Sequence, residues 1–458
     1  MIVDIALLKK YDKAGPRYTS YPTAPYFHDG VGEKAFIDHI EKDNNSLQKR
    51  DLSLYFHIPF CDTLCYFCGC NMMVSRNQIK ITEYLKYLEK EIRLLKARLD
   101  PSRKVIQMHW GGGTPTHLTP DQIKRLGKAI HDSFEFQPNA EVSVEIDPRE
   151  LTPAHMEALA DAGFNRCSMG IQDFDHKVQK AVNRIQPQQI TEDALGWARD
   201  LHFGSINLDL MYGLPHQTTA TFSDTIDKVI GMNPDRLAVF NYAHLPSMIK
   251  HQQLIHEEWL PTVDQKLELL KLSIEKLSSA GYIYIGMDHF AKPDDELTIA
   301  MNNGTLYRNF QGYSTHAGIN LLAMGITSIS MLSDLYIQNY KKMDDYYRSL
   351  NENKLPAMRG VILTAEDQLR RDVITELMCN FRISKAKFEQ KYKISFDTHF
   401  AEALDHLKTF EEDGLINLTH EELIVTQTGR LLIRNIAMNF DEYLMKKQGE
   451  KPRFSRTV

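Results

Sequence analysis

The sequence predicts an α/β protein built around a parallel β-sheet, and three observations support this. From residue 52 onward, short runs of β-branched or aromatic residues alternate with amphipathic helical segments. Six such units in series imply a parallel sheet, because parallel strands need crossover connections between them. Cysteine, glycine and acidic residues gather directly after these strands, where α/β sheets place their functional groups. The sheet is expected to be open or curled toward a barrel.

The strands are expected at residues 52–58, 104–110, 141–146, 166–171, 205–211 and 236–241. The helices between and after them are expected at residues 79–98, 120–134, 153–162, 188–201, 220–230 and 264–280. In the first of these helices, Leu85, Leu88, Ile92 and Leu95 recur at helical spacing, which indicates a single apolar face.

The N-terminal region, residues 1–35, is predicted to be an extended arm. It contains the segment GPRYTSYPT, in which Pro16 and Pro22 hold their neighbours in β or polyproline conformations. Such an arm either packs on the surface or brings Arg17 and its tyrosines to a site. The second interpretation is favoured.

The remainder of the chain divides into a core, residues 36–362, and a C-terminal domain, residues 363–458. Past Tyr282 the pattern becomes irregular, which suggests long loops covering one end of the sheet. The C-terminal domain is predicted to be mostly helical and winged-helix-like. Its helices are expected at residues 366–380, 384–392, 398–413 and 427–444, with short strands at residues 415–418 and 423–426. A docking or lid role fits it better than DNA binding, because no basic stripe is present.

Composition sets broad limits on function. The 458 residues are 43% hydrophobic and 25% charged, as in an ordinary soluble protein, and the formal charge of -6 gives no footprint for nucleic acid or anionic membranes. No run approaches the roughly 20 apolar residues of a membrane span, and the N-terminus lacks a signal-peptide pattern. A cytoplasmic protein is therefore expected, in a compartment where thiols stay reduced.

Four of the six cysteines lie within ten residues, in the segment YFHIPFCDTLCYFCGCN. Cys61, Cys65 and Cys68 have the spacing Cys-x3-Cys-x2-Cys, which lets one loop direct three sulfurs toward one centre. Thiolates select iron–sulfur clusters or zinc. Three cysteines on a cubane of four irons leave one iron open, whereas Cys70 as a fourth ligand would make a closed cluster or zinc knuckle. Cys167 and Cys379 stand alone and are expected to be buried core residues.

The run His-Trp-Gly-Gly-Gly-Thr-Pro places Gly111, Gly112, Gly113 and Thr114 just after a strand. It is neither a P-loop nor a dinucleotide fingerprint. Glycines allow the backbone to approach a neighbour closely. A tight turn would explain one of them, but three suggest a ligand such as a small zwitterion.

Several polar side chains follow or end the later strands. Glu145 and Asp209 lie in strands expected to be buried on both faces, where a charge is costly unless it is paired. A ribose diol would suit either carboxylate, and a salt bridge at the strand end is the alternative. Gln172 and Arg184 flank the fourth crossover, and the Arg184 fork suits a carboxylate. Tyr55 and Phe67 flank the cysteines and could cover an adenine or belong to the core.

Together these segments resemble the radical S-adenosylmethionine (SAM) enzymes and, more narrowly, the family of oxygen-independent coproporphyrinogen III oxidases of haem biosynthesis. The resemblance runs from the arm motif PRYTSYPT through the cysteine and glycine segments to FNYAHLP, GMDHFA and GRLLIRNI, and so covers nearly the whole chain. It implies an incomplete (β/α)6 radical SAM barrel. It also implies a [4Fe–4S] cluster on Cys61, Cys65 and Cys68.

The chemistry implied is the anaerobic oxidative decarboxylation of two propionates of coproporphyrinogen III to vinyl groups, which gives protoporphyrinogen IX. By resemblance, an electron from the cluster cleaves SAM to a 5′-deoxyadenosyl radical. A first SAM would contact Tyr55, Phe67, Gly112, Glu145 and Ile329. A second SAM would contact Gly113, Thr114, Gln172, Arg184, Asp209 and Ala243. Cys70 would lie beside the cluster without binding it.

The family also implies an electron donor such as a flavodoxin or ferredoxin, an unknown electron acceptor, and a monomer. The composition predicts that the protein binds neither nucleic acid nor membrane. A haem-binding chaperone of the same superfamily is the main alternative. The PRYTSYPT arm and Cys70 favour the oxidase, because the chaperone-like relatives look shorter at the N-terminus and lack that cysteine. A zinc-dependent structural or nucleic-acid module using all four clustered cysteines is the second alternative.

Overall fold

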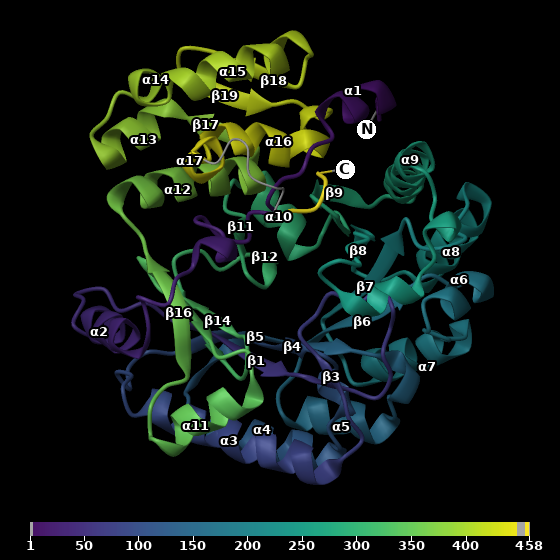
Figure 1. The fold of residues 1–458 in the computed structure, drawn as a ribbon, viewed down its shortest axis with the longest axis vertical. Coiled ribbons are helices and arrows are strands. Elements are labelled where there is room, and N and C mark those ends of the chain that lie inside the picture. Colours follow the sequence, from purple (N-terminus) through teal and green to yellow (C-terminus); the bar gives the residue numbers. More distant parts are fainter. Residues whose placement is uncertain (1–2, 447–453, 458) are drawn as a thin grey trace.

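A computed structural model describes residues 3–446 and 454–457 of the chain. Its centre is a twelve-stranded sheet whose middle strands are parallel in the order β1-β4-β5-β6-β7-β8. These strands are β1 (Leu52–Ile58), β4 (Val105–Gly112), β5 (Phe136–Ile146), β6 (Arg166–Gln172), β7 (Ser205–Tyr212) and β8 (Arg236–Asn241). The predicted parallel sheet is confirmed, and it is strongly curved (Figure 1).

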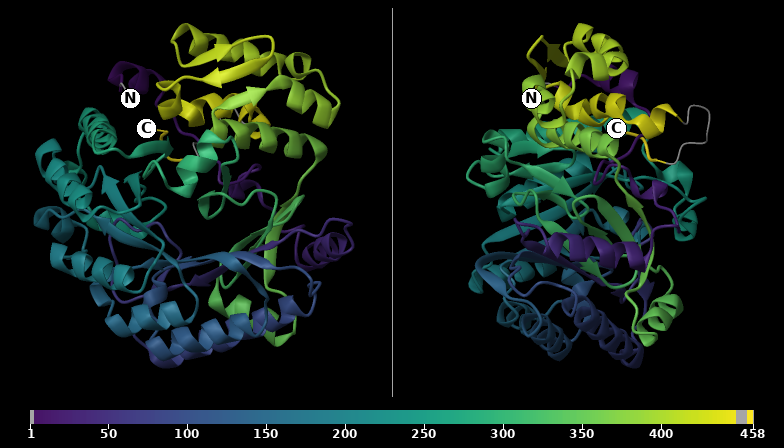
Figure 2. Two further views of the ribbon diagram at one scale, coloured as in Figure 1. Left: turned by 180° about the vertical axis from the view of Figure 1, so that it is seen from behind. Right: turned by 90° about the vertical axis from the view of Figure 1, so that its left-hand side faces the viewer.

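Helices cover the outer, convex side of this curved sheet (Figures 1 and 2). They are α3 (Gln78–Lys96), α4 (Pro120–His131), α5 (Pro153–Asp161), α6 (His176–Ala181), α7 (Gln188–Asp200), α8 (Thr219–Met232) and α9 (Val263–Ser279). In α4, Thr119 forms a capping box with Gln122, and Pro120 occupies the first turn, where its missing N–H costs nothing. Ile123, Leu126 and Ile130 then form the apolar stripe that packs against the sheet.

The middle strands alternate between buried and half-buried residues. In β5, Val142, Val144 and Ile146 are buried, whereas Ser143 and Glu145 are half-buried and line a cavity inside the curve. This corrects the expectation that these strands are buried on both faces. Because successive side chains of a strand point to opposite faces, the concave face of the sheet is free to carry polar groups.

The sheet continues at both edges, where the sequence suggested only loops. On one side β13 (Asn320–Met324) pairs parallel with β1, and β14 (Ile329–Met331), β15 (Leu335–Asn339) and β16 (Ala357–Ile362) follow antiparallel. On the other side β10 (His289–Ala291) and β9 (Ile283–Gly286) pair antiparallel beyond β8. Strands of three to six residues carry little periodicity of their own, so their distant partners decide their structure.

Smaller elements complete this core region. They are β2 (Phe60–Cys61) and β3 (Met73–Val74), the hairpin β11 (Tyr307–Asn309) and β12 (Gly312–Ser314), and the helices α10 (Glu296–Asn302) and α11 (Met343–Asn351).

The N-terminal region is only partly extended. It begins with α1 (Ile5–Tyr11), which Asp4 caps by accepting from the backbone N–H groups of Ala6 and Leu7. A 3-10 turn, η1 (Ala24–Tyr26), follows the extended GPRYTSYPT segment, and α2 (Glu33–Asn44) closes the region. The sequence analysis missed α1 because seven residues are too few to show a helical period.

The C-terminal region lies across the mouth of the curved sheet (Figures 1 and 2). Its helices are α12 (Ala365–Asn380), α13 (Lys385–Tyr392), α14 (Phe396–His399) and α15 (Ala401–Glu412). A small sheet of β17 (Arg382–Ser384), β19 (Glu422–Val425) and β18 (Ile416–Leu418) accompanies them.

The single helix expected at residues 427–444 is wrong. The segment is broken into η6 (Gly429–Leu432), α16 (Ile433–Ala437), η7 (Met438–Phe440) and α17 (Glu442–Met445). Asp441 has extended backbone and its side chain accepts from Tyr443 and Leu444 N–H, so it starts a new helix rather than continuing one.

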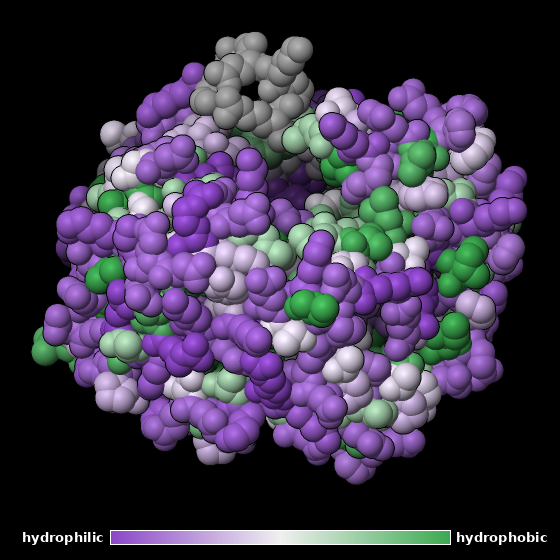
Figure 3. Space-filling model, turned by 60° about the horizontal axis from the view of Figure 1, so that its bottom comes forward, coloured by the Kyte–Doolittle hydropathy of each residue, from purple (hydrophilic) through white to green (hydrophobic). Residues whose placement is uncertain are grey.

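The arm and the end of the chain meet. Ala14 forms a β-bridge with Arg456, and Gly15 N–H donates to Ser455 O at 3.0 Å. The surface seen in Figure 3 is mostly hydrophilic, with hydrophobic residues scattered over it. Within residues 3–446 and 454–457, no helix is long and apolar enough to cross a membrane.

Candidate active site

The cysteine loop follows β1 and stands at the carboxyl end of the parallel strands. Cys61 ends β2, and its Sγ lies 3.3 Å from Thr114 Oγ1. Cys65 is buried, Cys68 is half-buried and Cys70 is exposed, and none of them forms a disulfide. The loop therefore presents three thiols that are at least partly shielded from solvent, beside the glycine segment.

Neighbouring protein atoms account for all three glycines of that segment. A Cβ on Gly113 would lie 2.8 Å from the Pro59 carbonyl, and one on Gly111 would lie 3.0 Å from the Glu145 carboxylate. Gly112 has φ of +122°, and a Cβ there would meet the His57 ring at 2.8 Å. No ligand is therefore needed to explain the three glycines, although one was expected from the sequence. They let β4 support the base of the cysteine loop.

Glu145 faces the concave side of the sheet beside this segment. Its Oε2 accepts from Gly112 N–H at 3.1 Å, and its Oε1 lies 3.4 Å from His109 Nε2. Burial raises the pKa of Glu145, but the His109 ring and the Gly112 amide outweigh it, so the pKa lies below its ordinary value. The carboxylate is therefore held ionised as an acceptor for hydroxyl or ammonium donors.

Glu145 and Asp209 line the same cavity, which has a volume of about 220 Å³. Asp209 accepts from Ser168 Oγ at 3.0 Å and from Asn207 Nδ2 at 2.7 Å. Burial raises the pKa of Asp209 to about 6 despite these hydrogen bonds. For Asp209 these bonds do not show the salt bridge that was the alternative, since Ser168 and Asn207 are neutral. For Glu145 the contact with His109 is a salt bridge when that ring is protonated.

Arg184 is buried and reaches the cysteine loop from the fourth crossover. Its Nη1 lies 3.0 Å from Asp147 Oδ2 and 3.6 Å from Cys65 Sγ, and its Nη2 donates to Gly170 O at 2.6 Å. The carboxylate that its fork meets in this structure is thus Asp147, from the end of β5. Arg184 Nε is buried without a hydrogen-bond partner among the described residues.

The structure adds Arg149, which the sequence analysis did not select. Arg149 Nη2 donates to Asp147 Oδ2 at 2.6 Å and to Cys65 Sγ at 3.5 Å. Burial raises the pKa of Asp147, but Arg184 and Arg149 together lower it to about 2. The only sequence signal for Arg149 is that it lies two residues after Asp147, which follows the end of β5.

The remaining predicted site residues lie around the cysteine loop, Glu145 and Arg184. Tyr55 stacks on His109 with 5.9 Å between ring centroids, and together with Ile329 it packs against the same small apolar cluster. Gln172 has φ of +70° and, like Arg184, faces Gly170. Ala243 lies farther out, on the segment after β8. Gln252 Nε2 links that segment to the cysteine loop, donating to Ala243 O at 3.3 Å and to Phe67 O at 3.2 Å.

The chemistry of the donor set fits an iron–sulfur cluster. The Cys70 thiol and N–H donate to Cys68 Sγ and lower the pKa of Cys68 to about 6. Burial raises the pKa of Cys61 to about 12. No three His, Cys, Asp or Glu side chains of the described residues come close enough to hold a single metal ion. In a cubane, each cysteine binds a different iron, so the sulfurs stand farther apart than around one ion.

Comparison with known proteins places the chain in a family. The sequence model of the Radical SAM superfamily matches residues 55–229, and that of the HemN C-terminal domain matches residues 363–432. The oxygen-independent coproporphyrinogen III oxidase of Escherichia coli is 48% identical over 455 residues, which is 99% of this chain and 98% of that protein. This chain belongs to the oxygen-independent coproporphyrinogen III oxidase family.

Other members agree with this assignment. The proteins of the same name from Pseudomonas aeruginosa and Helicobacter pylori are 45% and 44% identical, and each alignment covers at least 98% of both chains. The solved structure of coproporphyrinogen III oxidase (HemN) from Escherichia coli, described as a radical SAM enzyme, has a TM-score of 0.92 with 47% identity. That match covers 97% of this chain and 99% of that one. The chain thus shares the fold of that radical SAM enzyme along nearly its whole length, and the Radical SAM superfamily model itself matches residues 55–229.

Proposed function

We propose that this protein is an oxidoreductase of haem biosynthesis that decarboxylates two propionates of coproporphyrinogen III to vinyl groups, giving protoporphyrinogen IX without oxygen. The observation that carries the proposal is the Cys61–Cys65–Cys68 loop beside the glycine segment, where Cys61 contacts Thr114 and Gly112 N–H donates to Glu145. The full-length relatives that carry the oxidase name support the same activity.

In this proposal Cys61, Cys65 and Cys68 hold a [4Fe–4S] cluster with one open iron. When bound, the cluster supplies the electron that splits SAM into methionine and a radical able to take hydrogen from a propionate. Glu145 accepts hydrogen bonds from the SAM ribose, and Tyr55, Phe67, Gly112 and Ile329 form the remaining walls. These groups are half-buried, which limits the access of water to the reacting atoms.

A second SAM molecule is proposed at Gly113, Thr114, Gln172, Arg184, Asp209 and Ala243. Arg184 would have to share its fork between Asp147 and the SAM carboxylate, because Nη1 already bonds Asp147. The Oε1 of Gln172 has no hydrogen-bond partner among the residues that the structure describes, so it is an acceptor available to such a ligand.

We also propose three functional parts: an arm at residues 1–35, a radical SAM barrel with its edge strands at residues 36–362, and a winged-helix-like cover at residues 363–458. A flavodoxin or ferredoxin is the proposed class of electron donor. The protein is proposed to act as a monomer in the cytoplasm, where its six free thiols stay reduced.

The test is anaerobic incubation of the iron-loaded protein with coproporphyrinogen III, SAM and dithionite, followed by mass analysis of the porphyrins. We expect loss of two CO2 per macrocycle together with formation of methionine. Stoichiometric haem binding with no vinyl product would overturn the proposal in favour of a haem chaperone. Zinc without iron or acid-labile sulfide would overturn the cluster assignment.

A further inference from the structure

A second cavity lies behind the segment that follows β8. It has a volume of about 400 Å³ and is enclosed by the N-terminal arm, the ends of β7 and β8, the start of α9 and the C-terminal residues. Asn241, Ala243 and His244 form part of its wall. Gln252 donates to both Ala243 O and Phe67 O, so it links this wall to the cysteine loop.

The charged side chains that line this cavity are mostly cationic. Among the described residues they are Arg17, Lys266, Arg434, Arg456, Asp12 and Asp288, four cations against two carboxylates and thus a formal excess of two positive charges in this part of the chain. Each carboxylate is already engaged by an arginine: Asp288 pairs with Arg17, and Asp12 pairs with Arg456 at 2.5 Å. We call this site the basic cavity.

The hydrogen bonds of the other two cations go to backbone carbonyls. Lys266 Nζ donates to Tyr242 O at 3.0 Å, and Arg434 Nε donates to Pro16 O at 3.0 Å. Arg434 is only 6% exposed. Burial lowers the pKa of Lys266 and lowers that of Arg434 to about 10. Asp12 acts on Lys266 and Asp288 acts on Arg434, but neither cation has a carboxylate at ion-pair distance among the described residues. A buried cation is costly when its charge is incompletely compensated, so a carboxylate that enters the cavity gains from both groups.

The remaining wall of the basic cavity is apolar. Leu245, Leu260 and Leu267 line it beside the cations. A ligand that fits such a wall has a hydrophobic body and a carboxylate at its edge. A pyrrole ring with a propionate side chain has this chemistry.

We propose that the basic cavity binds a propionate of the porphyrinogen substrate through Lys266, with the neighbouring pyrrole edge against the apolar wall. This inference rests on the proposed function and adds a binding site to it. The propionate held here is not the one that reacts, since none of Cys61, Cys65 and Cys68 lines the cavity. The site therefore orients the macrocycle so that a different propionate enters the barrel.

SAM is a poorer fit to the same cavity. Its sulfonium and ammonium groups are positive, so an excess of cations disfavours it despite its carboxylate. Ala243 lines the basic cavity, and its carbonyl oxygen accepts from Gln252, which also bonds the cysteine loop. The porphyrinogen and the second SAM would therefore both lie near this residue. Measuring both affinities separates the two occupants.

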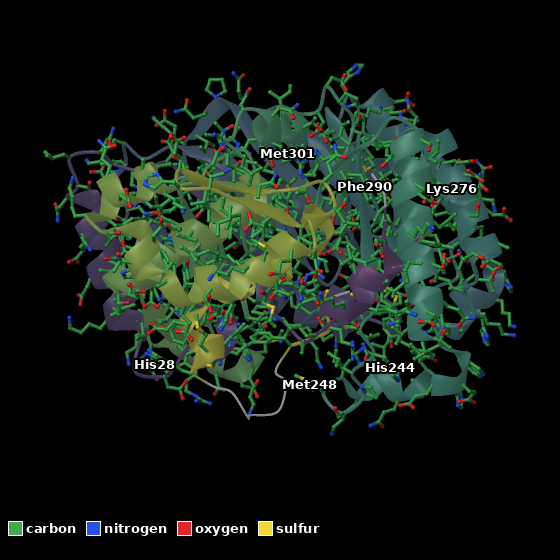
Figure 4. All side chains as sticks on the ribbon, turned by 90° about the horizontal axis from the view of Figure 1, so that it is seen from above. His28, His244, Met248, Lys276, Phe290 and Met301 are labelled. Carbon is green, nitrogen blue, oxygen red and sulfur yellow. The ribbon has the colours of Figure 1, made fainter. Side chains whose placement is uncertain are left out.

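The test measures binding of coproporphyrin III, the oxidised and unreactive macrocycle, to the anaerobic iron-loaded protein by fluorescence titration. In Lys266→Met the charge is lost with little change in length, and in Lys266→Arg it is retained. Lys276→Met is the matched control, because Lys276 lies on the same helix but pairs with Asp227 at 2.6 Å. Figure 4 shows Lys276 far along α9 from His244, which lines the cavity.

We expect Lys266→Met to bind coproporphyrin III roughly tenfold more weakly, as for the loss of one charged hydrogen bond. Lys266→Arg should restore most of the affinity, and Lys276→Met should match the wild type. SAM affinity, iron content and melting temperature should stay unchanged in all three variants. Unchanged porphyrin affinity in Lys266→Met overturns the proposal, as does a loss confined to SAM. A wild type that binds coproporphyrin III but forms no vinyl product refutes the proposed function instead.

Discussion

Arg149 donates a hydrogen bond to the sulfur of Cys65, with Nη2 and Sγ 3.5 Å apart. Arg184 approaches the same sulfur at 3.6 Å, and Asp147 bonds both guanidinium groups. Three charges with a net value of +1 thus surround the buried cysteine of the loop. Hydrogen bonds to cluster sulfurs and nearby charge set the reduction potential of iron–sulfur sites.

Replacing Arg149 by Gln should make the cluster harder to reduce. Loss of a positive charge disfavours the added electron, and a roughly tenfold change in the one-electron equilibrium corresponds to ~59 mV. Asp147→Asn should shift the potential in the opposite direction, because it removes negative charge. The measurement is a redox titration followed by electron paramagnetic resonance.

Arg76→Gln is the control for this pair. Arg76 bonds Asp62 in the same loop, with Nη2 and Oδ2 2.6 Å apart, but no hydrogen bond joins it to a cysteine among the described residues. The reduction potential of the cluster in the Arg76→Gln variant should match that of the wild type. Shifts of the same sign in Arg149→Gln and Asp147→Asn would show that loop disorder, not charge, is responsible.

Replacing Cys61, Cys65 or Cys68 by Ser should abolish iron binding, the brown colour and activity together. Cys70→Ser should lower activity more than iron content, because Cys70 donates to Cys68 and we propose that it is not itself a ligand. Cys379→Ser is the control, since Cys379 is buried in α12. Iron and acid-labile sulfide analysis reads out each variant, and equal iron loss in Cys70→Ser would make it a ligand after all.

Gly113→Ala should destabilise the protein by about 1–3 kcal/mol, as overpacking does. The added Cβ would meet backbone atoms of Pro59 and Phe60 at 2.8 Å, and backbone cannot rotate away. Gly196→Ala in α7 is the matched control, since nothing lies within 4 Å of its Cβ position and alanine favours helix. Thermal melting distinguishes them. A Gly113→Ala protein as stable as the Gly196→Ala protein would contradict the packing described here.

The buried carboxyl group of Glu91 should make the free energy of unfolding decrease as the pH rises. Burial raises its pKa from 4.5 to about 7, although Tyr346, Gly325 and Asn339 donate hydrogen bonds to it. Between these two values the folded protein holds a proton that the unfolded chain has lost, so the free energy of unfolding decreases from about pH 4.5 to about pH 7. Glu91→Gln should flatten this part of the melting temperature profile. An unchanged slope would refute the assignment.

The cysteine loop and the six parallel strands could be predicted from the sequence because their signals are local. The spacing of Cys61, Cys65 and Cys68 lies within one loop. Residues such as Val142 and Val144 mark a strand by alternation alone. The placement of Glu145 at a strand end followed from the same pattern and from the rule that parallel sheets carry function at that edge.

Other features were decided only by the tertiary structure. The edge strands β13 to β16 are too short to show a clear period-two pattern, and several of their hydrogen-bonding partners lie far away in sequence. The contact of Arg149 with Cys65 spans 84 residues. The basic cavity joins Arg17, Lys266 and Arg434 from three distant segments. Such contacts depend on how the helices and strands pack against one another. No short stretch of sequence carries a signal for this packing, because the contacting residues are far apart along the chain.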